Sequence, residues 1–257
     1  VAGDPGQLTG GYLYDARMVA ALRDRGRDVQ VIGLEGRFPL PDDLARRSMA
    51  QALAALPDGA RVVIDGLAMG GLPEVIAPHA DRLMIIALVH HPLADETGLD
   101  EATRQQLFDS ETRALALVRR VIVTSRFTAR GLERFAVAPE RLAVVEPGVE
   151  PAPLAASALD LESPGPRRLL CVATLVPRKG HDLLLEALAD LRDRDWTLEA
   201  IGSPERDPGH AARLFDATRR YGLEERIDWA GERSAAELAA AYHRAELFVL
   251  PSRYEGY

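Results

Sequence analysis

The chain has 257 residues, 47% of them hydrophobic and 27% charged, which is an ordinary composition for a globular protein. Its formal net charge of −8 argues against general nucleic-acid binding, because no basic excess is present to neutralise phosphates. The one cysteine, Cys171, excludes a disulfide within the chain, and no apolar run reaches the roughly 20 residues that a membrane span needs. We therefore expect a cytoplasmic protein of one large or two ordinary domains.

Strands and helices alternate along residues 1–150. A loop at 3–11 precedes a helix that presents Tyr14, Met18 and Leu22 on one face. The uniform apolarity of the strand expected at 61–65 is typical of a parallel sheet covered on both faces. The remaining strands of this half are expected at 29–34, 83–89, 121–124 and 142–146, and its remaining helices at 42–56, 72–80, 101–119 and 125–135.

Residues 151–167 contain four prolines and no periodicity, which predicts a linker. The alternation restarts after it, and the first helix there should place Leu183, Leu184 and Leu188 on its apolar face. Ser234 has the spacing of a capping box with the glutamate three residues later. Strands are expected at 169–174, 197–201, 226–229 and 247–250, and helices at 182–192, 209–221 and 234–243.

This pattern predicts two α/β domains, each with a mostly parallel sheet. An N-terminal Rossmann-like domain covers 1–150, the linker 151–167, and a C-terminal Rossmann-like domain 168–257. The chain starts with the remnant of a strand and stops just after one, so we expect the second domain to be incomplete.

Many unusual residues follow directly after predicted strands. Ligands of parallel α/β sheets bind outside the carboxyl ends of the strands, so two domains with facing strand ends would gather these residues around one cleft. The residues in question are Gly10, Gly11, His90, His91, Gly148, Arg178, Lys179, Gly202 and 252–255.

The turn Arg178–Lys179–Gly180 joins a buried strand to a helix. Backbone N–H groups, the helix dipole and two cations would together favour a phosphate or diphosphate there, whereas the simpler interpretation is a solvated basic turn. The expected gathering of strand ends favours the anion site. His90 and His91 are either structural histidines or donors to a substrate hydroxyl or phosphate, able to transfer protons near neutral pH.

Several motifs are absent from the sequence. It contains no Walker P-loop, no G-x-G-x-x-G that opens a helix after a strand, and no G-x-S-x-G nucleophile elbow. These absences weigh against an ATPase, an NAD-dependent dehydrogenase and a hydrolase of the nucleophile-elbow type. The six histidines lack metal-ligand spacing apart from one adjacent pair, so no metal site is expected.

The order of segments resembles the GT4 family of glycosyltransferases, which has the GT-B fold of two Rossmann-like domains. The most specific segments are PRKG at 177–180 and PSRYEG at 251–256. The supporting segments are Thr9-Gly10-Gly11, His91-Pro92-Leu93, 121–128 and 144–150.

The resemblance implies transfer of a sugar from a nucleotide sugar, such as a UDP- or GDP-sugar, to an unknown acceptor. The transfer would retain the anomeric configuration and need no metal or other cofactor. The C-terminal domain would hold the donor and the N-terminal domain the acceptor, for which Tyr12, Tyr14 and Asp95 are candidates. The implied catalytic residues are His91, Lys179 and Glu255, and the implied donor-binding residues are Gly10, Gly11, Arg178, Lys179, Gly202, Gly231, Glu232, Glu255, Gly256 and Tyr257, with His90 and Thr174 as further candidates.

The chain departs from the family pattern in two places. The family often has Gly-Arg where this chain has Ala173-Thr174, and Arg178 is the candidate substitute for the missing arginine. Glu255 matches the first glutamate of a pair whose second member would lie beyond Tyr257. A nucleotide-sugar-binding protein without transfer activity and a nucleotide-sugar epimerase of the same fold remain alternatives. Association with a membrane surface is compatible with the family, but the acidic balance does not support it.

Overall fold

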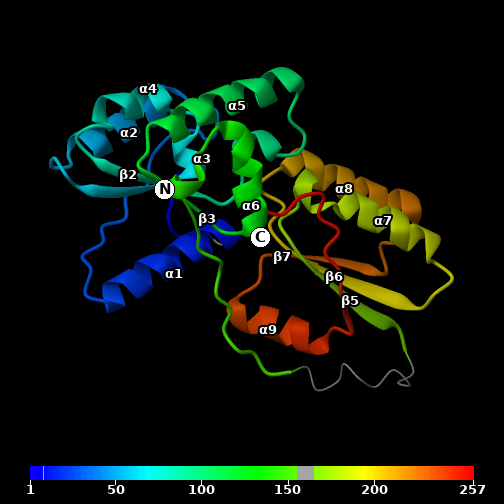
Figure 1. Ribbon diagram of the computed structural model, residues 1–257. Helices are drawn as coiled ribbons and strands as arrows, with labels where there is room; N and C mark the ends of the chain where they lie inside the picture. Colours follow the sequence, from blue (N-terminus) through cyan, green and yellow to red (C-terminus); the bar gives the residue numbers. More distant parts are fainter. Residues whose placement is uncertain (8, 155–164) are drawn as a thin grey trace. The chain divides into compact units, whose positions relative to one another are not determined.

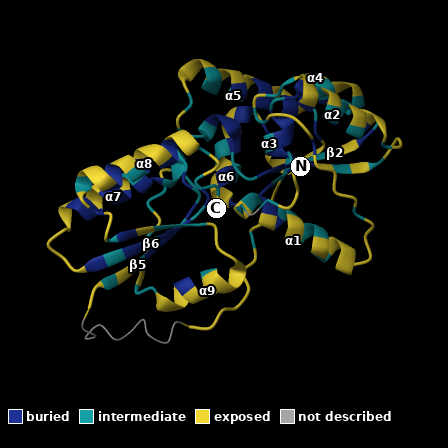
Figure 2. Cartoon of the chain, turned by 180° about the vertical axis from the view of Figure 1, so that it is seen from behind, coloured by how far each residue is buried: buried dark blue, intermediate teal, exposed yellow. Residues whose placement is uncertain are grey.

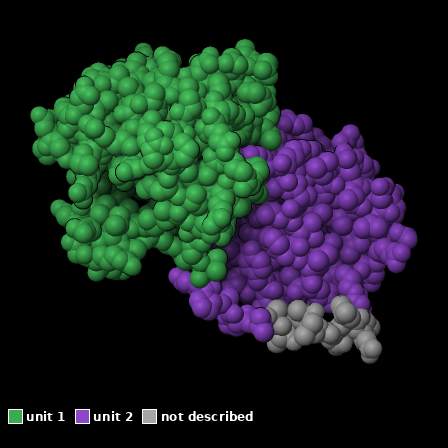
Figure 3. Space-filling model, viewed as in Figure 1, with its two compact units in different colours: residues 1–149, 255–257 green, residues 150–254 purple. Residues whose placement is uncertain are grey.

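The computed structural model describes residues 1–7, 9–154 and 165–257, so most of the predicted linker lies outside the described residues. The chain divides into two compact units, each of which is described by itself (Figure 3). Unit 1 comprises Val1–Val149 and Glu255–Tyr257, and unit 2 comprises Glu150–Tyr254. The last three residues thus cluster with unit 1, whereas the sequence assigned them to the C-terminal domain.

Unit 1 is built on a four-stranded sheet in the order β1-β2-β3-β4 (Figure 1), and its strands are parallel, as the sequence predicted. Ile85, Ala87 and Val121 lie on one face of the sheet and are fully buried in the core of unit 1, whereas Val63 on the opposite face is 54% exposed, so the cover on both faces that the sequence predicted is incomplete. The strands are β1 (Arg61–Asp65), β2 (Met84–Val89), β3 (Arg120–Val123) and β4 (Leu142–Val144), and the helices are α1 (Gly10–Asp24), α2 (Asp43–Ala54), α3 (Gly66–Met69), α4 (Pro73–Ile76), α5 (Glu101–Ala116) and α6 (Arg126–Gly131).

Side-chain caps fix where these helices begin. Asp42, Asp100 and Ser125 each accept a hydrogen bond from the backbone N–H three residues later, at the starts of α2, α5 and α6. The cap at Ser125 was predicted from the sequence. Helix α6 is short and tightens into a 3₁₀ turn, Leu132–Phe135, so the predicted helix 125–135 forms in two parts.

Two expectations for the start of the chain are wrong. The segment 29–34 forms no strand among the described residues; only Leu34 makes an isolated parallel bridge, to Ala2. Val31 and Ile32 are each 37% exposed and do not belong to the buried core. Helix α1 begins at Gly10, so the two glycines lie in its first turn rather than in a loop, and Leu22 on the expected core face is 38% exposed.

Unit 2 contains a second four-stranded parallel sheet, in the order β7-β6-β5-β8. Figure 1 shows α7 and α8 on one face of this sheet and α9 on the other, and two separate groups of buried residues match these faces. The strands are β5 (Arg167–Val172), β6 (Trp196–Ile201), β7 (Ile227–Gly231) and β8 (Leu247–Phe248), and the helices are α7 (His181–Asp190), α8 (Pro208–Tyr221) and α9 (Ala235–Arg244).

The predicted capping box of α9 is present, since Ser234 and Glu237 each bond the other's backbone N–H. The predicted face of α7 is wrong by about one position. Leu184, Leu185 and Leu188 are buried against the sheet, whereas Leu183 is 44% exposed. Figure 2 shows buried and exposed residues alternating along α7. The run of leucines is compatible with either rotation of the helix, and packing against β5 and β6 selects one of them.

Candidate functional site

The histidine pair follows β2 at the carboxyl edge of the unit 1 sheet. His90 Nε2 lies 3.1 Å from Asp15 Oδ1 on α1, and the His90 ring meets the ring of Tyr14 edge-on, with centroids 5.4 Å apart. Burial alone would lower the pKa of His90, but the hydrogen bond and charge of Asp15, with the charge of Asp65, outweigh it and raise the pKa above its ordinary value. The second histidine, His91, has its Nε2 3.4 Å from Glu96 Oε2.

Helix α1 approaches the histidine through a glycine. A Cβ at Gly11 would lie 3.3 Å from His90 Cδ2, so the absence of a side chain lets the first turn of α1 pack on the imidazole. The sequence predicted that Gly11 and His90 belong to one site. It did not identify Asp15 as the partner of His90, because 75 residues separate them and no local pattern links them.

Gly256, near the end of the chain, lies against the same histidines within unit 1. The Gly256 carbonyl accepts hydrogen bonds from the hydroxyls of Ser125 and Thr128, the latter at 2.7 Å. The same Thr128 hydroxyl lies 3.3 Å from the His90 carbonyl. A Cβ at Gly256 would come within 2.2 Å of the His90 oxygen and 3.3 Å of His91 Cβ. Any side chain there would push the segment away, and so glycine is required for this contact.

A buried carboxylic acid supports the loop after the histidines. Glu111, on the inner face of α5, is fully buried, and its Oε2 accepts a hydrogen bond of 2.9 Å from the backbone N–H of Leu93. Its Oε1 has no hydrogen-bond partner among the described residues. Burial raises the pKa of Glu111 to about 8, and the hydrogen bond from the Leu93 N–H opposes this rise. The sequence motifs did not point to Glu111.

In unit 2 the basic turn is held in a fixed conformation. Pro177–Lys179 form a 3₁₀ turn, and Gly180 adopts a left-handed conformation, φ 68°, before α7 begins. A Cβ on Gly180 would lie 2.1 Å from the carbonyl oxygen of Pro251. Gly180 is therefore required twice, by its backbone angle and by this close approach.

The segment 251–254 is tied to this turn by charged hydrogen bonds. Arg253 forms a bidentate pair with Asp182, at 2.8 and 2.7 Å, and also donates to the Pro177 carbonyl at 2.8 Å. The hydrogen bond and charge of Arg253 hold the pKa of Asp182 below its usual value. Arg178 Nη1 donates to the carbonyl of Tyr254 at 2.9 Å. One nitrogen of the guanidinium that the sequence predicted to bind phosphate is therefore hydrogen-bonded to the protein's own main chain.

Lys179 is partly buried on this turn, directly before the N-terminus of α7. It is the only lysine among the 31 basic residues of the sequence. Lysine carries a compact charge that approaches a phosphate oxygen as a point, whereas arginine presents a planar fork. Because the chain otherwise uses arginine, its single lysine points to a special role at position 179, and the sequence motifs did not make use of this observation.

Three further predicted residues meet at the carboxyl ends of β5, β6 and β7. Gly202 N–H donates to the Gly231 carbonyl at 2.9 Å, and a Cβ on Gly202 would lie 1.9 Å from the Ala173 carbonyl. Thr174, which follows Ala173, is partly buried, whereas Glu232 is exposed. The structure thus brings Gly202 and Gly231 together with the main chain at 173–174.

Within the described ranges, no group of three or more His, Cys, Asp or Glu side chains is arranged to hold a metal ion. No helix among the described residues is long and apolar enough to cross a membrane. The free thiol of Cys171 is fully buried, and burial raises its pKa to about 11. A thiol of this kind is not a nucleophile at neutral pH.

Residues 160–257 match the family described as Glycosyl transferases group 1. The chain is 29% identical over 241 residues to the MMP alpha-(1->4)-mannosyltransferase of Mycolicibacterium hassiacum, covering 86% of this chain and 54% of that protein. It is 32% identical over 140 residues to the D-inositol 3-phosphate glycosyltransferase of Kineococcus radiotolerans, covering 49% and 32%. The chain thus spans about half, or less, of the length of these relatives.

Among solved structures, the sucrose-phosphate synthase from Thermosynechococcus elongatus has a TM-score of 0.75 at 20% identity, covering 99% of this chain and 74% of that one. Anabaena Alr3699/HepE in complex with UDP and glucose has a TM-score of 0.59 at 17% identity, covering 94% and 65%. These similarities show that the two α/β units have the GT-B fold, as predicted.

Proposed function

Residues 160–257 belong to the glycosyl transferases group 1 family, and from this premise we propose that the protein transfers a sugar from a nucleotide-sugar donor to an acceptor. The observation that carries the proposal is the packing of Gly256 against His90 and His91. The histidines after β2 and the glycine near the end of the chain were both candidate site residues in the sequence. They meet in the structure, and the contact leaves no room for a side chain at Gly256. The proposal includes retention of the anomeric configuration and independence of a metal.

In the proposed reaction the bond from the anomeric carbon to the diphosphate breaks, and a bond from that carbon to an acceptor oxygen forms. The acceptor proton leaves with the nucleoside diphosphate. Negative charge grows on the diphosphate as its bond breaks, so catalysis needs fixed positive charge at that place. The Lys179 ammonium and the first backbone N–H groups of α7 would supply it.

The unit 1 residues would act on the sugar. His91 or His90 would donate a hydrogen bond to a sugar hydroxyl, and the raised pKa of His90 supports a donor at neutral pH. Glu255, next to Gly256, would accept hydrogen bonds from sugar hydroxyls. The relatives named above do not share one donor or one acceptor, so the base and the sugar are left to experiment. A cytoplasmic location is part of the proposal, supported by the single buried free cysteine.

The test is release of nucleoside diphosphate from UDP-glucose, UDP-galactose, UDP-N-acetylglucosamine and GDP-mannose by the full-length protein, with and without candidate acceptors. We expect one donor to be consumed together with an acceptor and Lys179→Ala to lose most of this activity. The loss of nucleotide affinity should be about tenfold or more, because a buried phosphate charge loses its partner. Arg47→Ala, which removes an exposed charge on α2, is the matched control.

Because the sequence has a single lysine, its side chain can be followed directly. An amine-acetylating reagent should modify Lys179, and saturating UDP or GDP should protect it, as a peptide map of the acetylated protein would show. Equal acetylation with and without every nucleotide would contradict the assignment. Binding without turnover would favour the non-catalytic alternative, and a change of the donor sugar without an acceptor would favour the epimerase.

A further inference from the structure

The turn that follows the histidine pair is anchored from inside unit 1. Leu93–Asp95 form a 3₁₀ turn, which the Asp95 N–H closes with a hydrogen bond of 3.1 Å to the Pro92 carbonyl. The N–H groups at the start of such a turn have no partner within it. The first of them belongs to Leu93, which is buried, so water does not reach it freely. Its partner is Glu111 Oε2 on α5, at 2.9 Å.

Glu111 is an unexpected residue for a position that only has to be filled. It is fully buried, and its Oε1 has no hydrogen-bond partner among the described residues. An unpaired buried polar atom is destabilising, and a leucine of similar volume would avoid this cost. What the carboxyl adds over an apolar side chain is the acceptor for the Leu93 N–H.

Two arginines hold the rest of the same turn. Arg104, one turn and a half before Glu111 on α5, donates from its Nη1 to the Ala94 carbonyl at 2.9 Å. Arg134, in the 3₁₀ turn after α6, forms an ion pair with Asp95. Each residue of the turn is therefore held by a side chain from another element of unit 1.

The end of the turn contacts the ring of His91. Glu96, the next residue, accepts the Thr97 N–H on its Oε1 at 3.0 Å, and its Oε2 lies 3.4 Å from His91 Nε2. The Glu96 N–H is in turn bonded to the Leu93 carbonyl, at 3.3 Å. A continuous chain of contacts thus runs from the buried Glu111 carboxyl through the turn to the imidazole.

We propose that Glu111 is a positioning residue for sugar transfer, which orients the His91 imidazole through the turn 93–96. It acts through the protein and touches neither donor nor acceptor. The inference rests on the proposed function, in which the histidine pair acts on the sugar and Lys179 on the diphosphate. Loss of the Glu111 acceptor should therefore slow the transfer and leave nucleotide binding unchanged.

Two substitutions in the full-length protein separate the acceptor from the volume of the side chain. Glu111→Leu removes the acceptor, and we expect kcat on the donor and acceptor found by the screen above to fall about tenfold or more, because catalysis is sensitive to small misplacements of an acting group. The Kd for UDP or GDP should stay that of the wild type. Glu111→Gln keeps an oxygen for the Leu93 N–H and should restore most of kcat. Wild-type kcat in Glu111→Leu, or no restoration in Glu111→Gln, would overturn the proposal.

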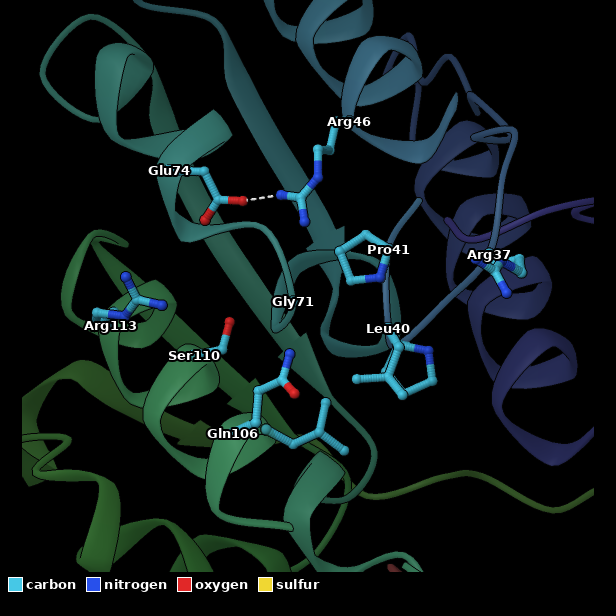
Figure 4. Close-up of a pocket in the computed structure, with 11 residues that line it drawn as sticks. Arg37, Leu40, Pro41, Arg46, Gly71, Glu74, Gln106, Ser110 and Arg113 are labelled. Atoms are coloured by element: carbon cyan, nitrogen blue, oxygen red, sulfur yellow. Dashed lines mark hydrogen bonds and ion pairs between the residues drawn. The ribbon is translucent and has the colours of Figure 1, made fainter. Parts of the chain in front are cut away.

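The matched control comes from the same helix. Ser110, directly before Glu111, is also buried, but Figure 4 shows it with Arg113 at a separate cavity of about 430 Å³. Ser110→Ala removes a buried hydroxyl from α5 and leaves the Glu111 hydrogen bond in place, so kcat should not change. An equal loss of kcat in Ser110→Ala would assign the effect to general loosening of α5 and contradict the proposal.

A further variant cuts the other end of the chain of contacts. The Glu96 side chain is 40% exposed, so Glu96→Ala leaves the core intact. It should lower kcat and leave the Kd for UDP or GDP unchanged, as Glu111→Leu does. Wild-type kcat in Glu96→Ala would refute the link to the His91 ring, and this result remains decisive if circular dichroism shows that Glu111→Leu does not fold.

Two measurements without substrate separate the positioning from sugar transfer itself. The Leu93 amide should exchange with solvent about tenfold faster or more in Glu111→Leu than in the wild type or Glu111→Gln, because its buried acceptor is lost. The nuclear Overhauser contact between the His91 ring and the Glu96 side chain should weaken in the same variant. If both changes occur but the wild type consumes no donor, the proposed function fails and the positioning stands. If the donor is consumed but neither change occurs, the positioning fails.

Discussion

Replacement of Glu111 by glutamine should remove a large pH dependence from the stability of unit 1. Folding buries this carboxyl completely and raises its pKa to about 8, whereas its ordinary value is 4.5. At a pH between these two pKa values, Glu111 keeps its proton in the folded state but has lost it in the unfolded chain. The free energy of unfolding must therefore fall as the pH rises through this window.

The size of the effect follows from the width of the window. Each pKa unit corresponds to about 1.4 kcal/mol, so a carboxyl raised from 4.5 to about 8 loses roughly 5 kcal/mol of stability by pH 8 and above. Glutamine has nearly the same shape and keeps an oxygen to accept the Leu93 N–H, but it cannot ionise. Any cost of burying its amide, about 1–3 kcal/mol, is the same at every pH and does not affect the slope.

Urea unfolding between pH 5 and 8.5 measures this slope. Both tryptophans, Trp196 and Trp229, lie in unit 2, so unit 1 has to be followed by circular dichroism and by hydrogen exchange of the Leu93 amide. Glu101→Gln on the same helix is the control, since its side chain is 86% exposed and its weak pair with Arg104 should contribute less than about 1 kcal/mol. If Glu111→Gln and the wild type lose stability in parallel as the pH rises, the carboxyl is already ionised in the folded state and the reasoning is wrong.

Three other predictions concern single contacts. Gly180→Ala should destabilise unit 2 by more than about 1 kcal/mol, because it adds the clash with the Pro251 carbonyl to the strain at φ 68°. Gly222→Ala, at φ 66° with open space around it, gives the strain alone, so equal losses of Tm would contradict the clash. His181 is fully buried and burial lowers its pKa to about 4, so unit 2 should lose up to about 3 kcal/mol as the pH falls from 6.5 to 4. Tryptophan fluorescence should show this loss in the wild type but not in His181→Gln; the same slope in both would refute it. Asp15→Asn should lower the pKa of His90, measured by NMR titration of the ring proton, and an unchanged titration would show that Asp15 does not hold the imidazolium.

The sequence by itself determined most of the elements and the class of fold. Segments such as 61–65 and 169–174 are short apolar runs of the kind that is typical of parallel strands, and this is visible locally. Helix starts at Ser125 and Ser234 depend on residues three apart, which also makes them local. The basic turn and the glycines at strand ends were identified in the same way, since each needs only its neighbours to be recognised.

Other features depend on contacts between distant residues, and only the tertiary structure decided them. The segment 29–34 has strand composition, but a strand needs a partner along its length, and among the described residues the segment makes one isolated bridge, between Leu34 and Ala2. The leucines of α7 fit two rotations of the helix, of which the sheet selects one. Asp15 meets His90 across 75 residues, and Glu111 meets the Leu93 N–H across 18.

The contact between Gly256 and His90 shows the same division. Its glycine could be read from the sequence, but the need for a glycine could not, because that need comes from a carbonyl far away in the chain. Local patterns fix which residues carry the chemistry. The tertiary structure fixes which of them meet, because that depends on the packing of elements that the sequence separates.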